Sequence, residues 1–310
     1  MNTSKQWSES DLPEFTGRSV VVTGGNSGLG LVVASELARA GASVTLAVRD
    51  VDKGSRAAAK MSGVVRVREL DLADLSSVRA FAAQQNEPID VLVNNAGVMM
   101  TPLGRTADGF ERQIGTNHLG HFALTNLLLE YITDRVVTVS SNAHQRGGID
   151  LDDLTWNRRK YSRSGAYAQS KLANLLFSNE LQRRLLESGS VVRSVAAHPG
   201  WAATNLQSHS GSALGGALMG IGNRFISQSA QMGALPALFA ISQELSGGSY
   251  IGPNGRGGLR GYPHSAAMSA AARDAVLAAR LWDLSASLTD TDFPNVEASA
   301  AVSPQQTVEG

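Results

Sequence analysis

The chain has 310 residues, of which 43% are hydrophobic and 17% charged, an ordinary globular composition with material for a sizeable core. Lysine plus arginine and aspartate plus glutamate both number 27, so no net basic charge favours nucleic acid. Cysteine is absent, which excludes disulfides, thiolate nucleophiles and cysteine metal sites. Neither a secretory signal nor an integral membrane segment is evident, and we expect a cytoplasmic protein.

Short apolar runs and helical periods alternate along the first two thirds of the chain. A β-branched run at 19–23 leads into a Gly-rich turn, and a helix is expected over residues 30–40. Buried strands separated by helices are typical of a mostly parallel sheet covered on both faces. We therefore predict one α/β domain of the doubly wound, Rossmann type. The other expected strands cover residues 43–48, 64–70, 89–93, 135–140 and 191–197, and the other helices residues 74–84, 117–131 and 165–186.

Beyond Gly200 the pattern loosens. The stretch 202–231 is rich in Gly, Ala and Ser with scattered large apolar side chains, and we expect it to form an apolar lid over the substrate. Helical spacing returns at 233–244 and within 266–288. The predicted organisation is an N-terminal extension at 1–15, a single domain at 16–288 and a disordered tail at 289–310.

A Gly-rich turn, Thr-Gly-Gly-Asn-Ser-Gly-Leu-Gly at 23–30, joins the first strand to the first helix. Glycines permit positive φ and let the backbone approach a pyrophosphate, which the helix N-terminus attracts. Plain turn chemistry is the alternative, but the position in the first βα unit favours a dinucleotide.

The end of the second strand bears on which dinucleotide binds. An acid there would accept from the ribose hydroxyls of NAD, but Arg49 comes first and Asp50 follows it. A guanidinium suits a 2′-phosphate, so we predict NADP(H), with a solvated arginine as the alternative. Asp71, after the third strand, either bonds the adenine amino group or caps the helix near Asp74.

Tyr167 and Lys171 are four residues apart at the start of a predicted helix, so both side chains can point into one site. Tyrosine is a poor base at neutral pH because its unperturbed pKa is about 10. A nearby cation stabilises phenolate, so we expect Lys171 to lower the pKa of Tyr167. Ser141 follows the preceding strand and could polarise a substrate carbonyl, with a turn serine as the alternative.

Three further segments follow expected strands or begin a helix. The Asn-Asn-Ala-Gly stretch at 94–97 leaves room for a cofactor, and Asn117 is expected near a helix start with a structural role. Pro199 and Gly200 form a turn that could free backbone groups for the nicotinamide amide. We predict no metal site, because the histidines are not spaced as ligands; these are His118, His121, His144 and His198.

Taken together, these motifs resemble the short-chain dehydrogenase/reductase family and follow its order over roughly residues 16–205. Stretches such as Asn-His-Leu-Gly-His-Phe at 117–122 are similar to its retinol dehydrogenase-like branch, which includes WW-domain oxidoreductases and protochlorophyllide reductases. The resemblance implies an NADP(H)-dependent oxidoreductase that moves a hydride between nicotinamide and a lipophilic alcohol, aldehyde or ketone.

The resemblance also implies roles for single residues. Tyr167 would be the acid/base, Lys171 would hold the nicotinamide ribose, and Ser141 would orient the substrate oxygen. Asn117 would support a proton relay to Lys171 through water. Asn94 would lie near the adenosine ribose and Thr204 near the carboxamide. The implied cofactor-binding residues are Gly24, Asn26, Ser27, Gly28, Leu29, Gly30, Arg49, Asp71, Leu72, Asn94, Ala96, Gly97, Tyr167, Lys171, Pro199, Gly200 and Thr204.

One feature departs from the shortest members of the family, because the gap between Ser141 and Tyr167 is longer here. The added segment, 144–164, contains Trp156 and five basic residues. It could wall the pocket or touch a membrane, but a solvated hairpin is favoured. Two rival functions stand beside the oxidoreductase: a non-catalytic NADP(H)-binding sensor or scaffold, and an epimerase or dehydratase. Homodimer and homotetramer are both left open.

Overall fold

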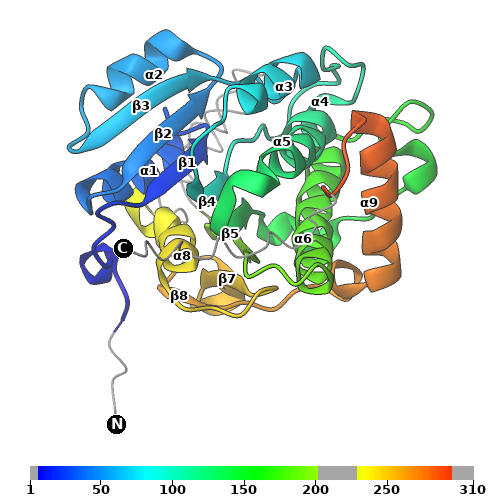
Figure 1. The fold of residues 1–310 in the computed structure, drawn as a ribbon. Helices are drawn as coiled ribbons and strands as arrows, with labels where there is room; N and C mark the ends of the chain where they lie inside the picture. Colours follow the sequence, from blue (N-terminus) through cyan, green and yellow to red (C-terminus); the bar gives the residue numbers. More distant parts are fainter. Residues whose placement is uncertain (1–5, 202–228, 295–310) are drawn as a thin grey trace, which may run out of the picture.

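An eight-stranded sheet forms the centre of the structure, a computed structural model that describes residues 6–201 and 229–294 (Figure 1). The strand order is β3-β2-β1-β4-β5-β6-β7-β8, and all neighbours are parallel except the antiparallel pair β7 and β8. The strands are β1 (Ser19–Thr23), β2 (Ser43–Val48), β3 (Val64–Glu69), β4 (Ile89–Asn94), β5 (Ile132–Val139), β6 (Arg193–Ala197), β7 (Tyr250–Pro253) and β8 (Pro263–Ser265). The predicted fold class is confirmed.

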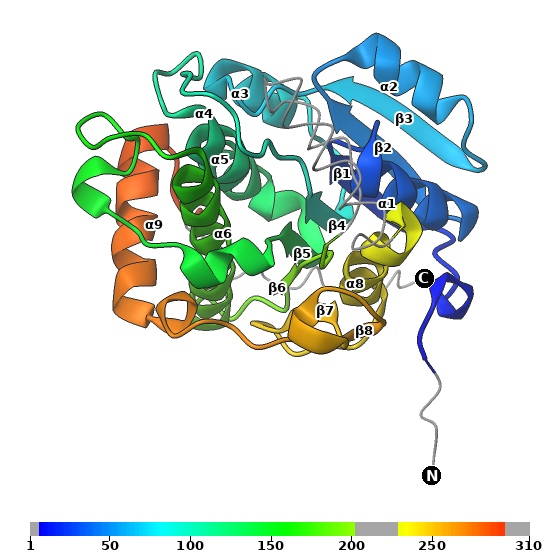
Figure 2. The same ribbon diagram turned by 180° about the vertical axis from the view of Figure 1, so that it is seen from behind.

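Helices cover both faces of the sheet, because alternate strand residues point to opposite sides. Val20 and Val22 pack in one core cluster with α1 and α8, whereas Val21 packs in a second cluster with α3, α5 and α6. In both views α9 lies alongside α6 (Figures 1 and 2). The helices of the described residues are α1 (Gly28–Arg39), α2 (Val51–Ala58), α3 (Leu75–Ala83), α4 (Arg112–Ile114), α5 (Gly120–Leu128), α6 (Arg163–Glu187), α8 (Ala230–Ser242) and α9 (Ala275–Thr289).

Three elements were absent from the prediction. The strands β7 and β8 lie in a stretch that the sequence marked only as Gly-rich, and they have four and three residues. Strands of three or four residues are too short to show an alternation of apolar and polar side chains in the sequence. The helix α2 was also missed, although Asp50 caps it by accepting a hydrogen bond from the backbone N–H of Lys53 at 2.8 Å.

Both ends of the predicted domain extend beyond their expected limits. Phe15 is buried in the core, and the Trp7 ring meets the Phe239 ring of α8 edge-on at 5.3 Å, so the N-terminal extension packs on the domain. Trp282 Nε1 donates to Asp292 Oδ1 at 2.7 Å, so contacts with α9 continue past residue 288. The expected tail from 295 on, and the expected lid over 202–228 with Thr204, lie outside the described residues.

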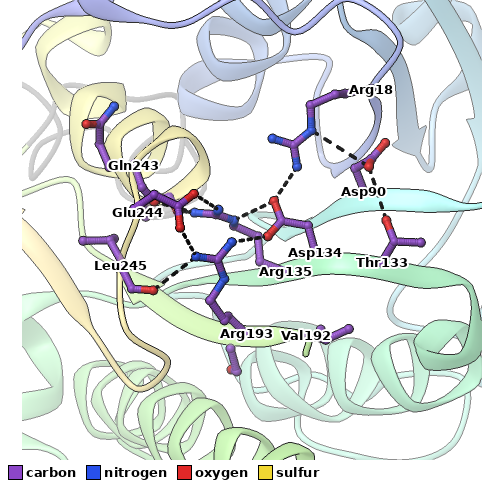
Figure 3. A network of polar contacts seen from close by, with 12 residues as sticks. Arg18, Asp90, Thr133, Asp134, Arg135, Val192, Arg193, Gln243, Glu244 and Leu245 are labelled. Carbon is purple, nitrogen blue, oxygen red and sulfur yellow. Dashed lines mark hydrogen bonds and ion pairs between the residues drawn. The ribbon is translucent and has the colours of Figure 1, made fainter. Parts of the chain in front are cut away.

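At the amino edge of the sheet, charged side chains join the starts of β1, β4, β5 and β6 (Figure 3). Asp134 accepts hydrogen bonds from Arg18, Arg135 and Arg193. Arg135 is 2% exposed, and its Nη1 also donates to the carbonyl oxygens of Ala240 and Gln243, at 3.1 and 2.7 Å. These carbonyls end α8, so one buried guanidinium ties that helix to β5.

Candidate active site

Most of the predicted site residues that the structure describes lie around the carboxyl edge of the sheet, where β1, β4, β5 and β6 end (Figure 1). From β1 the chain adds strands toward one side of the sheet (β2, β3), and from β4 it adds strands toward the other side (β5, β6). Ligands of open α/β sheets bind beyond the strand ends at the place where this direction reverses, here between β1 and β4. A cavity of about 10 Å³ there is lined by residues from all these loops and from α8: Leu29, Asn95, Val139, Ala197, His198, Pro199, Gly233, Ala234 and Ala237.

The Gly-rich turn adopts a backbone that glycine favours. Gly24 and Gly28 have φ of +66° and +56°, in the left-handed region. A Cβ on Gly30 would lie 2.4 Å from Asn95 Nδ2 and 2.6 Å from the carbonyl oxygen of Gly24, so α1 starts in close contact with the strand ends. Ser27 is the N-cap position, and Asn26 and Leu29 are partly exposed in the same turn. The first N–H groups of α1 therefore point toward this edge, as a pyrophosphate requires.

Arg49 follows β2 directly, beside the turn, since the Gly24 N–H donates to the carbonyl oxygen of Ala47 at 2.8 Å. The Arg49 side chain is exposed. Asp50 is occupied as the cap of α2, so its carboxylate is already engaged by a backbone N–H.

The structure excludes the helix cap as the role of Asp71, and the contact with adenine stays a prediction. Asp74, not Asp71, caps α3, accepting from the backbone N–H of Ser76 at 2.8 Å. Asp71 Oδ1 instead accepts from the Ala73 N–H at 2.9 Å in the turn before the helix. Leu72 is 5% exposed and packs in the core, and a Cβ on Gly120 would lie 2.3 Å from its carbonyl oxygen.

The Asn-Asn-Ala-Gly stretch places its two amides on different sides. Asn94 is 1% exposed, and its Nδ2 donates to Thr125 Oγ1 of α5 at 2.9 Å, so its side chain is turned away from the strand edge. Asn95 Nδ2 instead donates to the carbonyl oxygen of Thr23 at 2.8 Å. The N–H of Ala96 donates to Thr23 Oγ1 at 2.9 Å. Gly97 lies where a Cβ would be 3.7 Å from Lys171 Nζ.

Asn117 lies within a helical stretch and not near its start, which corrects the prediction. The helix begins five residues earlier because Glu111 caps it, accepting from the Ile114 N–H at 2.9 Å. Gly115–Leu119 forms a π-helical turn, a feature often found at functional sites. Asn117 Oδ1 accepts from the Val98 N–H at 2.8 Å, and its Nδ2 donates to the Val98 carbonyl oxygen and to Ser170 Oγ, both at 2.9 Å.

Ser141, Tyr167 and Lys171 meet where β5 ends and α6 begins. Ser141 lies close enough to Tyr167 to lower the pKa of its phenol, and Ser141 Oγ accepts from the Ala143 N–H at 3.2 Å. Lys171 is 5% exposed; its Nζ lies 5.9 Å from the centroid of the Tyr167 ring and donates to the Val139 carbonyl oxygen at 3.0 Å.

The titration of this pair differs from the expectation. Burial raises the pKa of the Tyr167 hydroxyl, and the Ser141 side chain only partly opposes that rise. Burial also lowers the pKa of Lys171 to about 8. The ammonium is directed to a carbonyl oxygen and not to the phenol, so Lys171 does not make this phenol acidic in the arrangement described.

The turn after β6 packs against the loop that follows β7. Gly200 has φ of +66°, and a Cβ there would lie 2.5 Å from the carbonyl oxygen of Leu259. His198 is 2% exposed, and its Nδ1 accepts from the Gly200 N–H at 3.2 Å. Pro199 lies between them at the edge of the small cavity.

The inserted segment is not a solvated hairpin. Leu154 and Trp156 are buried, and Arg159 stacks on the Trp156 ring at 3.8 Å and pairs with Asp153. Tyr161 donates to Glu111 Oε1 at 2.9 Å, which joins the segment to the start of the Asn117 helix. Leu154 packs in a core cluster with residues of α6, a contact that the sequence of the insertion alone does not indicate.

Three residues of the site were missed: Thr23, Asn95 and His121. Thr23 and His121 were noticed only as parts of a turn and of a histidine set, and Asn95 only as the neighbour of Asn94. Their shared signal is position, because each lies at a strand end or one helical turn after Asn117. Within the described ranges, no group of three or more His, Asp or Glu could hold a metal ion. No helix there is both long and apolar enough to cross a membrane.

Comparisons with known proteins agree with this geometry. The family model described as short chain dehydrogenase matches residues 18–215. Human retinol dehydrogenase 13 is 43% identical over 298 residues, covering 90% of this chain and 87% of its own. Human retinol dehydrogenase 12 is 48% identical over 209 residues, 64% of this chain and 65% of its own. The crystal structure of an uncharacterized Mycobacterium Paratuberculosis protein, 54% identical, covers 94% of this chain and all of that one with a TM-score of 0.83.

The chain belongs to the short-chain dehydrogenase family, whose members are oxidoreductases that bind a nicotinamide cofactor. Within it, the relatives place the chain in the retinol dehydrogenase-like branch. The residues fit such a cofactor, because the Gly30 contact leaves no room for a side chain and positive φ recurs at Gly24 and Gly28.

Proposed function

We propose that this chain uses NADP(H) to interconvert a lipophilic alcohol and its aldehyde or ketone, with Tyr167 as the acid/base. The proposal is carried by the meeting of Ser141, Tyr167 and Lys171 at the carboxyl edge, next to the Gly-rich turn. A bound nicotinamide would supply or accept the hydride. The chain itself would bind the substrate oxygen and move the proton.

In the reduction direction Tyr167 would donate its hydroxyl proton to the substrate oxygen as the carbonyl carbon becomes an alcohol carbon. Burial raises the pKa of Tyr167, which keeps the phenol protonated at neutral pH and suits a proton donor. The Ser141 hydroxyl would orient the same oxygen. Lys171, with a pKa of about 8, carries its charge at neutral pH and would hold the ribose. Asn117, which bridges to Ser170, would support return of a proton toward Lys171 through water.

Preference for NADP(H) rests on Arg49. Its exposed guanidinium follows β2 beside the Gly-rich turn, where a ribose 2′-phosphate would lie. Asp50, the acid that follows Arg49 directly, accepts from the Lys53 N–H as the cap of α2. No acid stands before Arg49 at the tip of β2, in the place that favours NAD, and this supports the preference for NADP(H).

A lipophilic substrate is supported by the names of the relatives, retinol dehydrogenases 12 and 13. The segment expected to cover the substrate lies outside the described residues, and only its apolar sequence supports a lipophilic substrate. A cytoplasmic location and a homodimer or homotetramer stay predictions.

The test is turnover of NADPH with a panel of aldehydes, ketones, quinones and steroids, with retinal included. We expect turnover with bulky apolar carbonyls, and Tyr167→Phe should lower kcat at least 100-fold while leaving the dissociation constant for NADPH within threefold. Binding of NADPH without turnover of any carbonyl would instead favour the sensor. Turnover confined to small charged carbonyls would contradict the lipophilic substrate.

A further inference from the structure

His121 connects two parts of the site through both nitrogens of its ring. The residue lies in α5, is 1% exposed, and has Nδ1 at 3.0 Å from the carbonyl oxygen of Asn117. A carbonyl only accepts, so Nδ1 must carry the proton. In the neutral ring Nε2 is then an acceptor, and the Thr23 hydroxyl, 2.9 Å away, donates to it.

The two partners of His121 belong to different halves of the site. Thr23 Oγ1 accepts the N–H groups of Asn95 and Ala96, both at 2.9 Å, at the end of β1 where the Gly-rich turn starts. Asn117 holds the Val98 backbone and Ser170 with its side chain. A continuous chain of hydrogen bonds therefore runs from the cofactor turn to the residue expected to serve the proton relay.

We propose that His121 is a positioning residue that couples the cofactor turn to the Asn117 carbonyl. The inference rests on the proposed function, because that function assigns cofactor binding to the Gly-rich turn and the proton relay to Asn117. Because His121 is buried, it would act without touching substrate or cofactor, by setting the position of the Asn117 carbonyl and the orientation of the Thr23 hydroxyl.

A neutral imidazole is required for this arrangement, and the surroundings supply it. Burial lowers the pKa of His121 to about 4, the hydrogen bond to Asn117 opposes that shift, and the charge of Lys171 adds to it. A doubly protonated ring would direct a second N–H at a hydroxyl oxygen that already accepts from two amides. The bridge therefore requires the neutral His121 ring with its proton on Nδ1.

The two arms of the bridge can be separated by substitution, because α5 contains a precedent. Asn126 Nδ2 donates to the carbonyl oxygen four residues earlier, that of Phe122, at 3.1 Å. Asparagine at position 121 should reach the Asn117 carbonyl in the same way while losing the longer reach to Thr23. Phenylalanine at position 121 keeps the ring and removes both arms.

His118 provides the matched control. It is also a buried histidine of the same helical stretch, at 2% exposure, but its Nε2 meets Ser285 Oγ of α9 at 2.9 Å, away from the site. We would measure kcat, the dissociation constant for NADPH by fluorescence, and the melting temperature for His121→Asn, His121→Phe, His118→Asn and His118→Phe.

The proposal predicts a split between the variants. His121→Asn should weaken NADPH binding at least threefold with kcat within threefold of the parent. His121→Phe should weaken binding to the same degree and also lower kcat at least tenfold. The His118 variants should lower only the melting temperature. The proposal is overturned if the His121 variants lose only thermal stability, or if the His118 variants reproduce their effects.

A measurement on the unsubstituted protein covers the case in which a variant fails to fold. The ¹⁵N shifts of the imidazole nitrogens should show His121 in the Nδ1–H tautomer and should move when NADPH is added; the Nε2–H tautomer, or no response to NADPH, refutes the coupling. Neither this readout nor the dissociation constant needs turnover. An unsubstituted protein that binds NADPH but reduces no carbonyl would thus refute the proposed function without refuting the role of His121.

Discussion

Thr23 and Asn95 hold the ends of β1 and β4 together by two hydrogen bonds, both donated by Asn95 and both accepted by Thr23. The Asn95 N–H donates to Thr23 Oγ1 at 2.9 Å, and Asn95 Nδ2 donates to the Thr23 carbonyl oxygen at 2.8 Å. Thr23 is fully buried, and the same hydroxyl accepts from the Ala96 N–H. The crevice in which the strand order diverges is therefore set by one hydroxyl and one amide.

Thr23→Val should lower the free energy of unfolding by about 3 kcal/mol, because the N–H groups of Asn95 and Ala96 lose their acceptor at about 1–3 kcal/mol each. Thr23→Ser keeps the hydroxyl and is the matched control, with a loss of about 1 kcal/mol for the missing methyl. Urea unfolding of the three proteins measures the difference. Equal stability of the Val and Ser variants would show that the hydroxyl does not hold the strand ends.

Gly30→Ala should weaken NADPH binding at least tenfold. Its Cβ would lie 2.6 Å from the Gly24 carbonyl oxygen, so backbone of the turn must move, and that backbone is where a pyrophosphate would bind. Gly148→Ala is the control, since a Cβ there meets nothing within 4 Å. Fluorescence titration with NADPH compares the two. An unchanged dissociation constant for Gly30→Ala would argue against this turn as the cofactor cradle.

Arg49→Ala should weaken NADPH binding about 10–100-fold and leave NADH binding within twofold. The expected loss is that of a charge-assisted contact to a 2′-phosphate, about 1.5–3 kcal/mol. Arg56→Ala, which removes another exposed arginine from α2, controls for the change in net charge. If NADH binds more tightly than NADPH before any substitution, the cofactor assignment is wrong.

Acid should destabilise the protein below pH 6.5 because buried histidines, His118, His121 and His198 among them, stay neutral in the fold. Burial lowers the pKa of His118 to about 3, and of His121 and His198 to about 4. The unfolded chain takes up protons near pH 6.5 that the folded chain does not. Stability is thus retained above pH 6.5 and falls toward pH 4, by up to about 1.4 kcal/mol per pH unit for each histidine. Urea unfolding at pH 7.5, 6.5, 5.5 and 5.0 tests this, and a flat profile from 6.5 to 5.0 would contradict it.

The parts of the fold that sequence predicted were those set by local chemistry. Strands such as β1 and β2 are rich in Val and other apolar residues because both faces of the sheet are covered. The glycines of the cofactor turn follow from a backbone that other residues adopt only with strain, as φ at Gly24 and Gly28 shows. Neither inference needs knowledge of distant segments.

The parts that sequence missed depend on residues far along the chain. The start of the Asn117 helix is set by Glu111, whose carboxylate is fully buried against Tyr161 from a segment fifty residues later. Whether Asn94 or Asn95 faces the crevice depends on the residue at which β4 ends, and a shift of that end by one residue would exchange the two side chains. The pKa of Tyr167 was predicted with the wrong sign because burial raises it and only Ser141 opposes that rise, and burial is a property of the packed structure.

Arg135→Met should lower the free energy of unfolding by about 3–5 kcal/mol while leaving kcat within twofold. The substitution removes a buried guanidinium, so two carbonyls at the end of α8 lose this donor and Asp134 keeps only Arg18 and Arg193 (Figure 3). Activity should persist because Arg135 lies near the amino end of β5, at the edge away from the site. Arg66→Met is the control: Arg66 pairs with Glu87 at 3.5 Å with both side chains more than 60% exposed, and such a pair contributes about 0–1 kcal/mol. Urea unfolding and NADPH turnover of both variants decide the matter, since equal losses of stability would mean that the network is no stronger than a surface ion pair.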